Sequence, residues 1–239
     1  MNVLVTGGTR GIGRAIALRF ARAGADRVAL GYMRNDRAAE EAATEVRAHG
    51  ADVTLVRGNI TSSRVLEEVR DLGRLDVVVH NAATGVIRPA LETEDRHWDW
   101  TMNANARALL QLARVAAPQM EPGASIVAIS SLGAQRVLEN YTLVGTSKAA
   151  LESLVRYLAV ELAPRGIRVN AVSGGVVDTG ALEHFPNREE MLAAGAANPV
   201  GRLVAPDDIA GAVAFLCSPD AAMVCGQTIV VDGGFSLTA

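Results

Sequence analysis

Residues 5–13 read VTGGTRGIG, at the end of a short apolar segment, and this stretch decides the fold. Gly7 permits a tight turn, Gly11 lets the backbone approach a pyrophosphate, and Gly13 allows close packing of the following helix. The N-terminus of that helix then faces the phosphates. A glycine-rich turn alone could be only a tight connection. Here strand, turn and helix occur in order, so the stretch predicts a dinucleotide-binding site.

The rest of the chain repeats this alternation of strand and helix. Apolar segments rich in β-branched residues recur at 2–6, 27–32, 52–58, 75–83, 124–131, 167–175 and 227–234. Their continuous apolar character implies burial on both faces of a sheet. Helical segments between most of them imply right-handed crossovers. We therefore predict an α/β fold: a single Rossmann-type doubly wound domain over residues 1–239, with a seven-stranded parallel sheet and helices on both faces.

The composition of the 239-residue chain fits a compact α/β protein, because 49% of the residues are apolar. The net charge is −3 and Lys and Arg are scattered, which argues against nucleic-acid binding. Apolar runs are interrupted well short of a membrane span, and a strand beginning at residue 2 leaves no room for a signal peptide. Cys217 and Cys225 lie in no metal-ligand pattern, so we predict no metal site and a reducing, cytoplasmic location.

Residues 179–204 break the alternation with a long segment punctuated by Gly and Pro, just after the sixth predicted strand. Ligands of doubly wound sheets bind at the carboxyl ends of the strands, and long loops there carry function. We predict that this segment is a substrate lid. The alternative is a helical excursion on the surface.

The end of the second predicted strand bears on the choice of nucleotide. Enzymes that use the non-phosphorylated cofactor place an acid there to bind the ribose hydroxyls. This chain has Gly31 and Tyr32 instead, and Asp36 begins the next helix. Arg10 and Arg34 are close enough in sequence to hold a 2′-phosphate, and guanidinium groups suit phosphate geometry. We therefore predict NADPH; the alternative is that both arginines are solvated surface charges.

Several further motifs give the chain a resemblance to the short-chain dehydrogenase/reductases over nearly its whole length. Residues 6–13 match the family's Thr-Gly-x3-Gly-x-Gly signature, and Asn-Ala-Ala at 81–83 resembles its Asn-Ala-Gly. Asn105 and Ser131 match the family's asparagine and serine. SGGVVDT at 173–179 stands where the family has Pro-Gly-x-Ile-x-Thr, with Gly174 in place of the proline.

This resemblance implies roles for individual residues in binding the cofactor. It places Asn81 and Ala82 at the ribose, Asn59 at the adenine, and Val177 and Thr179 at the carboxamide and diphosphate. The full predicted set is Gly7, Thr9, Arg10, Gly11, Ile12, Gly13, Arg34, Asn59, Ile60, Asn81, Ala82, Lys148, Val177 and Thr179.

The chain departs from the family pattern at the catalytic tyrosine. The family's usual tyrosine would stand at position 144, with three residues between it and Lys148, but this chain has Val144 there. Instead, Tyr141 precedes Lys148 with six residues between them. That spacing is the hallmark of the enoyl-acyl-carrier-protein reductases. Ser131, ten residues before Tyr141, together with NAATGVIRP, HWDWTMNANA and ALEHFPNRE, is most similar to the NADPH-dependent type III enoyl reductases.

The shift has a chemical rationale. In a ketone, hydride reaches the carbon that carries the oxygen, whereas in an enoyl thioester it reaches the β-carbon and charge develops on the thioester oxygen. A tyrosine three residues earlier on a helix is displaced by about 4.5 Å while keeping roughly the same face. Tyr141 is then expected to hydrogen-bond the enolate oxygen. Lys148 is expected to hold the nicotinamide ribose and to lower the pKa of Tyr141.

Other residues receive weaker assignments. Ser131 is expected to hold or orient the thioester; Ser130 is its competitor, but strand alternation and the resemblance favour Ser131. Asn105 either takes part in catalysis through a water chain or anchors a helix bend. We interpret Tyr157, on the same helix as Lys148, as a packing residue.

The resemblance implies a substrate and partners. Leu182, Phe185, Met191, Leu192, Val86 and Ile87 are candidates for an apolar acyl slot, although each could be ordinary core. Arg88, Arg136, Arg188 and Arg202 are candidates for a basic rim that steers an acidic acyl carrier protein. Long helices near 97–119 and 144–163 imply a homotetramer or homodimer.

The predicted function is therefore an NADPH-dependent enoyl-acyl-carrier-protein reductase of fatty-acid biosynthesis, acting on an enoyl chain carried by acyl carrier protein or coenzyme A. A ketone or alcohol oxidoreductase of the same fold is the first alternative. The second is a regulator that binds NADPH without chemistry.

Overall fold

In the computed structural model, all seven strands join one parallel sheet with the order β3-β2-β1-β4-β5-β6-β7. The structure describes residues 1–180, 182–185 and 187–238. The strands are β1 (Asn2–Thr6), β2 (Arg27–Tyr32), β3 (Asp52–Arg57), β4 (Val77–His80), β5 (Ser125–Ser131), β6 (Arg168–Gly174) and β7 (Thr228–Val231). The order reverses between β1 and β4, which creates the crevice at which doubly wound sheets bind their ligands. The predicted fold is confirmed.

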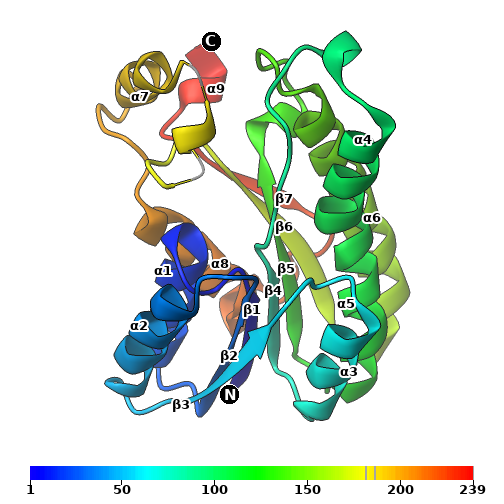
Figure 1. The fold of residues 1–239 in the computed structure, drawn as a ribbon. Helices are drawn as coiled ribbons and strands as arrows, with labels where there is room; N and C mark the ends of the chain where they lie inside the picture. Colours follow the sequence, from blue (N-terminus) through cyan, green and yellow to red (C-terminus); the bar gives the residue numbers. More distant parts are fainter. Residues whose placement is uncertain (181, 186, 239) are drawn as a thin grey trace.

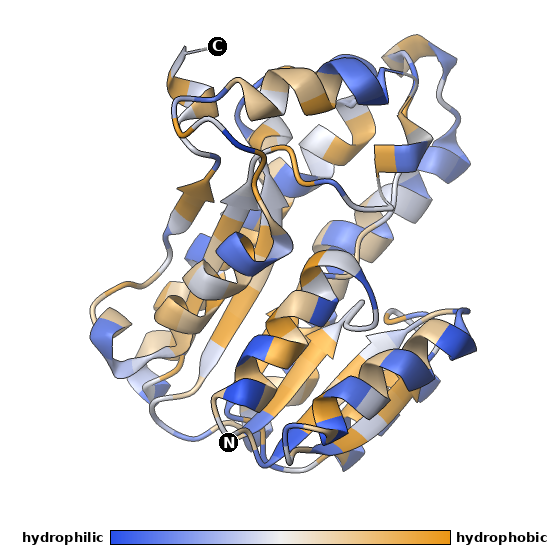
Figure 2. Cartoon of the chain, turned by 90° about the vertical axis from the view of Figure 1, so that its left-hand side faces the viewer, coloured by the Kyte–Doolittle hydropathy of each residue, from blue (hydrophilic) through white to orange (hydrophobic). Residues whose placement is uncertain are grey.

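Helices cover both faces of the sheet (Figure 1). The helices of the described residues are α1 (Gly11–Arg22), α2 (Asp36–Arg47), α3 (Ser63–Asp71), α4 (Asp95–Met102), α5 (Ala108–Ala116), α6 (Thr142–Leu162), α7 (Arg188–Ala196), α8 (Pro206–Cys217) and α9 (Phe235–Thr238), of which α7 and α9 lie beyond the carboxyl end of the sheet. One apolar cluster packs α1, α2 and α8 on the sheet, and a second packs α3, α5 and α6. The strands between them are strongly apolar while the outer helix faces are polar (Figure 2). Within the described ranges, no helix has the length and hydropathy needed to cross a membrane.

The helix predicted over residues 97–119 is interrupted. α4 ends at Met102, a π-helical turn occupies Asn103–Arg107, and α5 follows. Short π-helical segments of this kind are common at functional sites. The fully buried side chain of Asn105 lies in this turn and hydrogen-bonds the loop after β4 through Thr84. The bend therefore brings the helix against the carboxyl end of β4.

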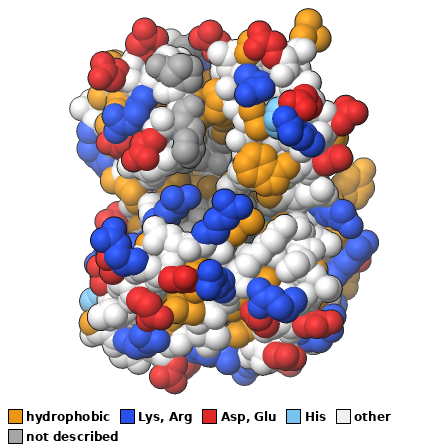
Figure 3. All heavy atoms as spheres, in the orientation of Figure 1, with side chains coloured by type: hydrophobic (Ala, Val, Ile, Leu, Met, Phe, Trp, Pro, Cys, Tyr) orange, Lys and Arg blue, Asp and Glu red, His pale blue; other side chains and the backbone are white. Residues whose placement is uncertain are grey.

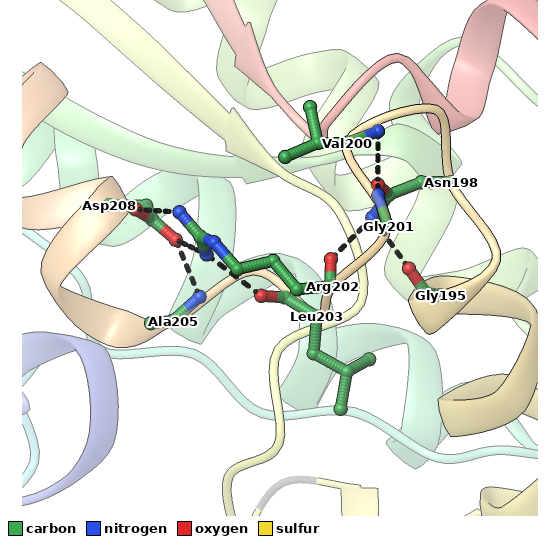
Figure 4. A network of polar contacts seen from close by, with 8 residues as sticks. All are labelled: Gly195, Asn198, Val200, Gly201, Arg202, Leu203, Ala205 and Asp208. Atoms are coloured by element: carbon green, nitrogen blue, oxygen red, sulfur yellow. Dashed lines mark hydrogen bonds and ion pairs between the residues drawn. The ribbon is translucent and has the colours of Figure 1, made fainter.

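The segment predicted as a lid contains a short 3₁₀ helix (Leu182–His184) and α7, and residues 181 and 186 of it lie outside the described residues. Its return to the sheet is fixed by Asn198 (Figure 4). The Asn198 amide donates to the carbonyls of Gly195 (2.6 Å) and Arg202 (2.7 Å). Its oxygen accepts from the backbone N–H groups of Val200 (2.9 Å) and Gly201 (3.0 Å). One buried side chain therefore shapes the whole connection to α8.

Candidate active site

A cavity of about 1030 Å³ opens at the carboxyl ends of the strands. It is lined from the turn after β1, the ends of β2, β4 and β5, the start of α6, and the segment after β6. Figure 3 shows the molecule hollowed at mid-height, with Lys and Arg side chains gathered along the hollow. All predicted cofactor residues except Gly13 line this cavity. The predicted cofactor residues other than Gly13 therefore lie around one cavity.

The turn after β1 is closed by contacts that exclude side chains. A Cβ on Gly13 would lie 2.1 Å from the carbonyl oxygen of Gly7 and 2.5 Å from Nδ2 of Asn81. Gly7 and Gly11 have φ values of +63° and +51°, a region that glycine adopts readily. Gly11 stands at the first residue of α1, so the helix N-terminus points into the cavity wall. This cradle fits the diphosphate of a dinucleotide.

Asn81 has a structural task in addition to the contact with the ribose that is predicted for it. Its Nδ2 donates to the carbonyl oxygens of Thr6 (3.1 Å) and Gly7 (3.0 Å), so the amide holds the end of β1 in place. The Thr6 hydroxyl in turn accepts from the backbone N–H groups of Asn81 (3.1 Å) and Ala82 (3.0 Å). Asn81 and Ala82 still line the cavity where the ribose was predicted. Their contribution to the cradle is structural as well.

The surroundings of the second strand fit a 2′-phosphate. Arg10 and Arg34 are exposed, line the cavity, and form no ion pair with any residue that the structure describes. Asp36 is already engaged, since it accepts from the Tyr32 hydroxyl (2.9 Å) and pairs with Arg57 (3.4 Å). Two unpaired guanidinium groups and an occupied carboxylate favour a phosphorylated ribose.

Tyr141 is the N-cap residue of α6, which begins at Thr142. Its carbonyl accepts the first helical hydrogen bond, from the backbone N–H of Gly145 (2.7 Å), so Tyr141 stands at the very start of the helix. Its hydroxyl donates to Oγ of Ser131 (3.3 Å). The ring lies 5.9 Å from that of Phe185, and a Cβ on Gly133 would be 2.5 Å from it. The ring is therefore held between Phe185 and the turn that follows β5.

Val144 occupies the position of the family's usual tyrosine. Its side chain is buried and packs on the loop after β4, where a Cβ on Gly85 would lie only 2.1 Å from Val144 Cγ2. Val144 does not line the cavity, whereas Tyr141, Ser131 and Lys148 do. The aromatic hydroxyl of this site therefore comes from position 141.

Lys148 is buried, and its Nζ donates to the carbonyl oxygen of Ile129 (2.7 Å). Burial lowers its pKa to about 8, an effect partly opposed by the charge of Glu152. The predicted lowering of the Tyr141 pKa is wrong. Burial of the phenol raises that pKa, and the hydrogen bond with Ser131 opposes the rise only in part.

Asn105 and Ser130 lie outside the arrangement around Tyr141. Asn105 does not line the cavity, and its Nδ2 donates to the carbonyl of Thr84 (2.9 Å) and the hydroxyl of Ser147 (2.8 Å). It therefore anchors the helix bend, one of its two predicted roles. Ser130 directs its hydroxyl to Glu152 (2.6 Å), so Ser131 is the serine that faces Tyr141.

The family assignment follows from sequence comparison as well as from this geometry. A family model described as enoyl-(acyl carrier protein) reductase matches residues 7–236. The chain is a short-chain dehydrogenase/reductase. A 1-cyclohexenylcarbonyl-CoA reductase of Streptomyces collinus is 38% identical over 99% of this chain and 87% of its own length.

Other members of the short-chain dehydrogenase/reductase family differ in their chemistry. A hydroxynaphthalene reductase-like protein Arp2 of Metarhizium brunneum is 36% identical over 97% of this chain and 93% of its own. The crystal structure of BdcA in complex with NADPH has a TM-score of 0.87 at 34% identity, covering 98% of this chain and 93% of that one. The family includes reductases of thioesters and of aromatic ring systems, so membership alone does not give the substrate.

The substrate side of this short-chain dehydrogenase/reductase is only partly as predicted. Leu182, Phe185 and Met191 line the cavity. The prediction is wrong for Leu192, Val86 and Ile87, which do not. The sequence analysis missed Trp100, Leu138 and Phe235 as lining residues. Trp100 stands in a quoted family motif, but its exposure to the cavity depends on the bend after α4.

Two of the four arginines of the predicted basic rim are paired with carboxylates of the chain. Arg188 pairs with Asp178 (2.7 Å), and Arg202 forms a two-pronged pair with Asp208 (2.6 and 2.9 Å; Figure 4). Arg136 donates to the backbone carbonyl of Ser236. Tyr157 was also misjudged, because its side chain is 75% exposed in the protomer. The surface therefore gives less support to an acidic protein partner than the sequence suggested.

Proposed function

We propose that this short-chain dehydrogenase/reductase reduces the carbon–carbon double bond of an α,β-unsaturated acyl thioester with NADPH. The position of Tyr141 carries this proposal. Tyr141 stands three residues before the usual position, as the N-cap residue of α6, and the usual position is filled by Val144, packed on Gly85. A hydroxyl displaced in this way suits a charge that develops two carbons away from the carbon that receives hydride.

The cofactor site supports NADPH. The cradle of Gly7, Gly11 and Gly13 would hold the diphosphate, and Arg10 and Arg34 would hold the 2′-phosphate. When bound, NADPH supplies the hydride for the β-carbon. The structural neighbour BdcA carries NADPH on the same fold.

The residues of the chain then have distinct tasks. The Tyr141 hydroxyl donates a hydrogen bond to the thioester oxygen as negative charge develops there, which is where an oriented donor lowers the barrier most. Uptake of a proton at the α-carbon then completes the reduction. The high pKa of this buried phenol keeps it in the donor form at neutral pH. Ser131 orients the hydroxyl through their shared hydrogen bond (3.3 Å). Lys148 holds the nicotinamide ribose from the cavity wall.

Coenzyme A is favoured over acyl carrier protein as the carrier of the substrate. The relative from Streptomyces collinus is by name a reductase of a coenzyme A thioester with a ring substituent. A role in fatty-acid biosynthesis and a cytoplasmic location remain part of the proposal.

We also propose that the protein assembles as a homodimer or homotetramer. Tyr157 and Val160, three residues apart on α6, are exposed at 75% and 78% in the protomer. Contact with another subunit through α6 would cover both side chains.

The second candidate function is reduction of a carbonyl group. The relative from Metarhizium brunneum, by name a hydroxynaphthalene reductase-like protein, favours this alternative. In that case Tyr141 would serve a carbonyl carbon from its displaced position.

The experiment is NADPH oxidation followed at 340 nm with crotonyl-CoA, crotonyl-acyl-carrier-protein, 1-cyclohexenylcarbonyl-CoA and acetoacetyl-CoA in parallel. Turnover of an unsaturated thioester, without turnover of acetoacetyl-CoA, supports the proposal and identifies the carrier. Turnover of acetoacetyl-CoA alone contradicts it and makes the protein a carbonyl reductase. Tight NADPH binding without any turnover would indicate a nucleotide-binding regulator.

A further inference from the structure

The last three residues of β5 each hold one polar group of α6 or of its cap. The carbonyl of Ile129 accepts from Lys148 Nζ (2.7 Å). The hydroxyl of Ser130 donates to Oε1 of Glu152 (2.6 Å). The hydroxyl of Ser131 accepts from Tyr141 (3.3 Å). α6 lies along β5 (Figure 1), so one strand end aligns Tyr141, Lys148 and a third, acidic group.

Glu152 is a buried carboxylate that the proposed reaction does not use. It is 5% exposed and stands one helical turn after Lys148. Ser130 donates to one oxygen, and Gln135 Nε2 donates to the other (3.1 Å). No cationic side chain among the described residues lies within ion-pair distance of it. Burial of a carboxylate is costly unless it is hydrogen-bonded, and two donors meet that requirement here.

We infer that Glu152 is a positioning residue that acts through Lys148, supplying the buried negative charge that keeps the Lys148 ammonium cationic in the cavity wall. The inference rests on the proposed role of Lys148 in holding NADPH. Charges on neighbouring turns of a buried helix face interact strongly because water screens them poorly. Ser130 and Gln135 fix the carboxylate in the position from which it acts.

The other titratable groups around Lys148 do not supply this charge. His80 on β4 is buried, and its pKa falls to about 4, so it is neutral at pH 7. Tyr141 at the start of α6 has a raised pKa and is also neutral. Burial lowers the pKa of Lys148 to about 8, and Glu152 is the group that opposes this effect. Without the carboxylate, the Lys148 pKa falls further.

The test is the dissociation constant of NADPH as a function of pH, measured by nicotinamide fluorescence on the full-length protein without acyl substrate. In the wild-type protein, affinity weakens with a midpoint near pH 8 as Lys148 loses its proton. In Glu152→Gln, the midpoint moves down by about one pH unit. Glu161→Gln is the matched control, because Glu161 is exposed on the same helix, and its midpoint stays at the wild-type value. Lys148→Met abolishes the transition.

Two further variants separate charge from structure. Glu152→Asp keeps the charge and retains a midpoint close to that of the wild type, whereas Ser130→Ala removes one donor and shifts the midpoint less than Glu152→Gln does. A wild-type midpoint in folded Glu152→Gln, or a transition that survives in Lys148→Met, overturns the inference. Should Glu152→Gln fail to fold, an unshifted midpoint in Ser130→Ala overturns it.

The titration distinguishes this inference from the proposed function because it requires no acyl substrate. If no enoyl thioester is reduced but the midpoints shift as stated, the proposed reaction fails while the role of Glu152 stands. If enoyl thioesters are reduced but the midpoints coincide, the role of Glu152 fails alone.

Discussion

The nucleotide end and the tyrosine end of the cavity are built in different ways. Around Gly7 and Gly13 the shape depends on the absence of side chains within one short stretch, with a Cβ on Gly13 only 2.1 Å from the Gly7 carbonyl. Around Tyr141 it depends on side chains from distant segments, among them Phe185 and Ser131. A backbone-made site can be read from a local motif. A site made by side chains depends on packing between segments far apart in the sequence.

Removal of the Tyr141 hydroxyl is expected to have the largest effect that separates the two ends of the cavity. Tyr141→Phe lowers turnover of the unsaturated thioester by roughly 10²–10³-fold, the typical loss of an oriented donor to a developing oxyanion. NADPH affinity stays at the wild-type value, since the cradle is untouched. Steady-state kinetics and fluorescence titration measure both effects. Tyr157→Phe is the matched control on the same helix, and an equal loss in that variant would contradict the assignment.

His80 connects the end of β1, beside the nucleotide cradle, to the π-helical turn. Its ring lies 3.3 Å from the hydroxyl of Thr6, the last residue of β1, and 2.8 Å from the carbonyl of Asn105 in that turn. Burial holds its pKa at about 4, below the ordinary 6.5. The unfolded chain therefore takes up the proton first as the pH falls. Stability from this group is complete above pH 6.5 and is lost as the pH falls toward 4, by about 3 kcal/mol.

Urea unfolding at pH 7, 5.5 and 4.5 measures this loss. His80→Gln removes the titrating imidazole, so the unfolding free energy of this variant depends less on pH over that range than that of the wild-type protein. His49→Gln, a change at an exposed histidine, keeps the wild-type dependence. An identical pH dependence in all three proteins would show that His80 contributes no such term.

A methyl group added at Gly13 or at Gly133 is expected to impair one end of the cavity and leave the other intact. Gly13→Ala pushes against the Gly7 carbonyl and weakens NADPH binding, whereas Gly133→Ala pushes the Tyr141 ring, 2.5 Å from the added carbon, away from Ser131. The second variant lowers turnover but preserves NADPH affinity. Each overpacking costs about 1–3 kcal/mol. Gly211→Ala in α8 is the control, because its Cβ would meet nothing within 4 Å. Loss of both NADPH affinity and turnover in Gly133→Ala would contradict the independence of the two ends.

The smallest expected effect is a loss of NADPH affinity and concerns the nucleotide end of the cavity alone. Arg34→Ala weakens NADPH binding about tenfold, because a charge-assisted contact with the 2′-phosphate is lost, and leaves NADH binding unchanged. Fluorescence titration with both nucleotides provides the comparison. Arg37→Ala changes neither constant, since Arg37 lies outside the cavity and pairs weakly with Glu41 (3.7 Å). Equal weakening toward NADPH and NADH in Arg34→Ala would contradict a 2′-phosphate contact.

The sequence was sufficient for the sheet and for the nucleotide cradle because both follow local rules. The strand segments have continuous apolar character, and the glycine spacing prescribes the turn. It was insufficient for Glu152 and His80, whose importance depends on burial and on partners 22 and 25 residues away. It misjudged Arg188 and Arg202, because their acidic partners become neighbours only through the fold. The sequence also suggested that the charge of Lys148 lowers the pKa of Tyr141, whereas burial of the phenol raises it.

The contact between Val144 and Gly85 has a consequence for how this enzyme could evolve. Any bulky ring introduced at position 144 meets the loop after β4, which the valine already fills. A lineage that placed a tyrosine at position 144 would have to rebuild the loop at the same time, or pass through a poorly packed intermediate. Single-substitution libraries should therefore seldom recover a functional tyrosine at that position. The tyrosine is therefore kept at position 141 by the packing of Val144 on the loop after β4 as well as by its chemistry.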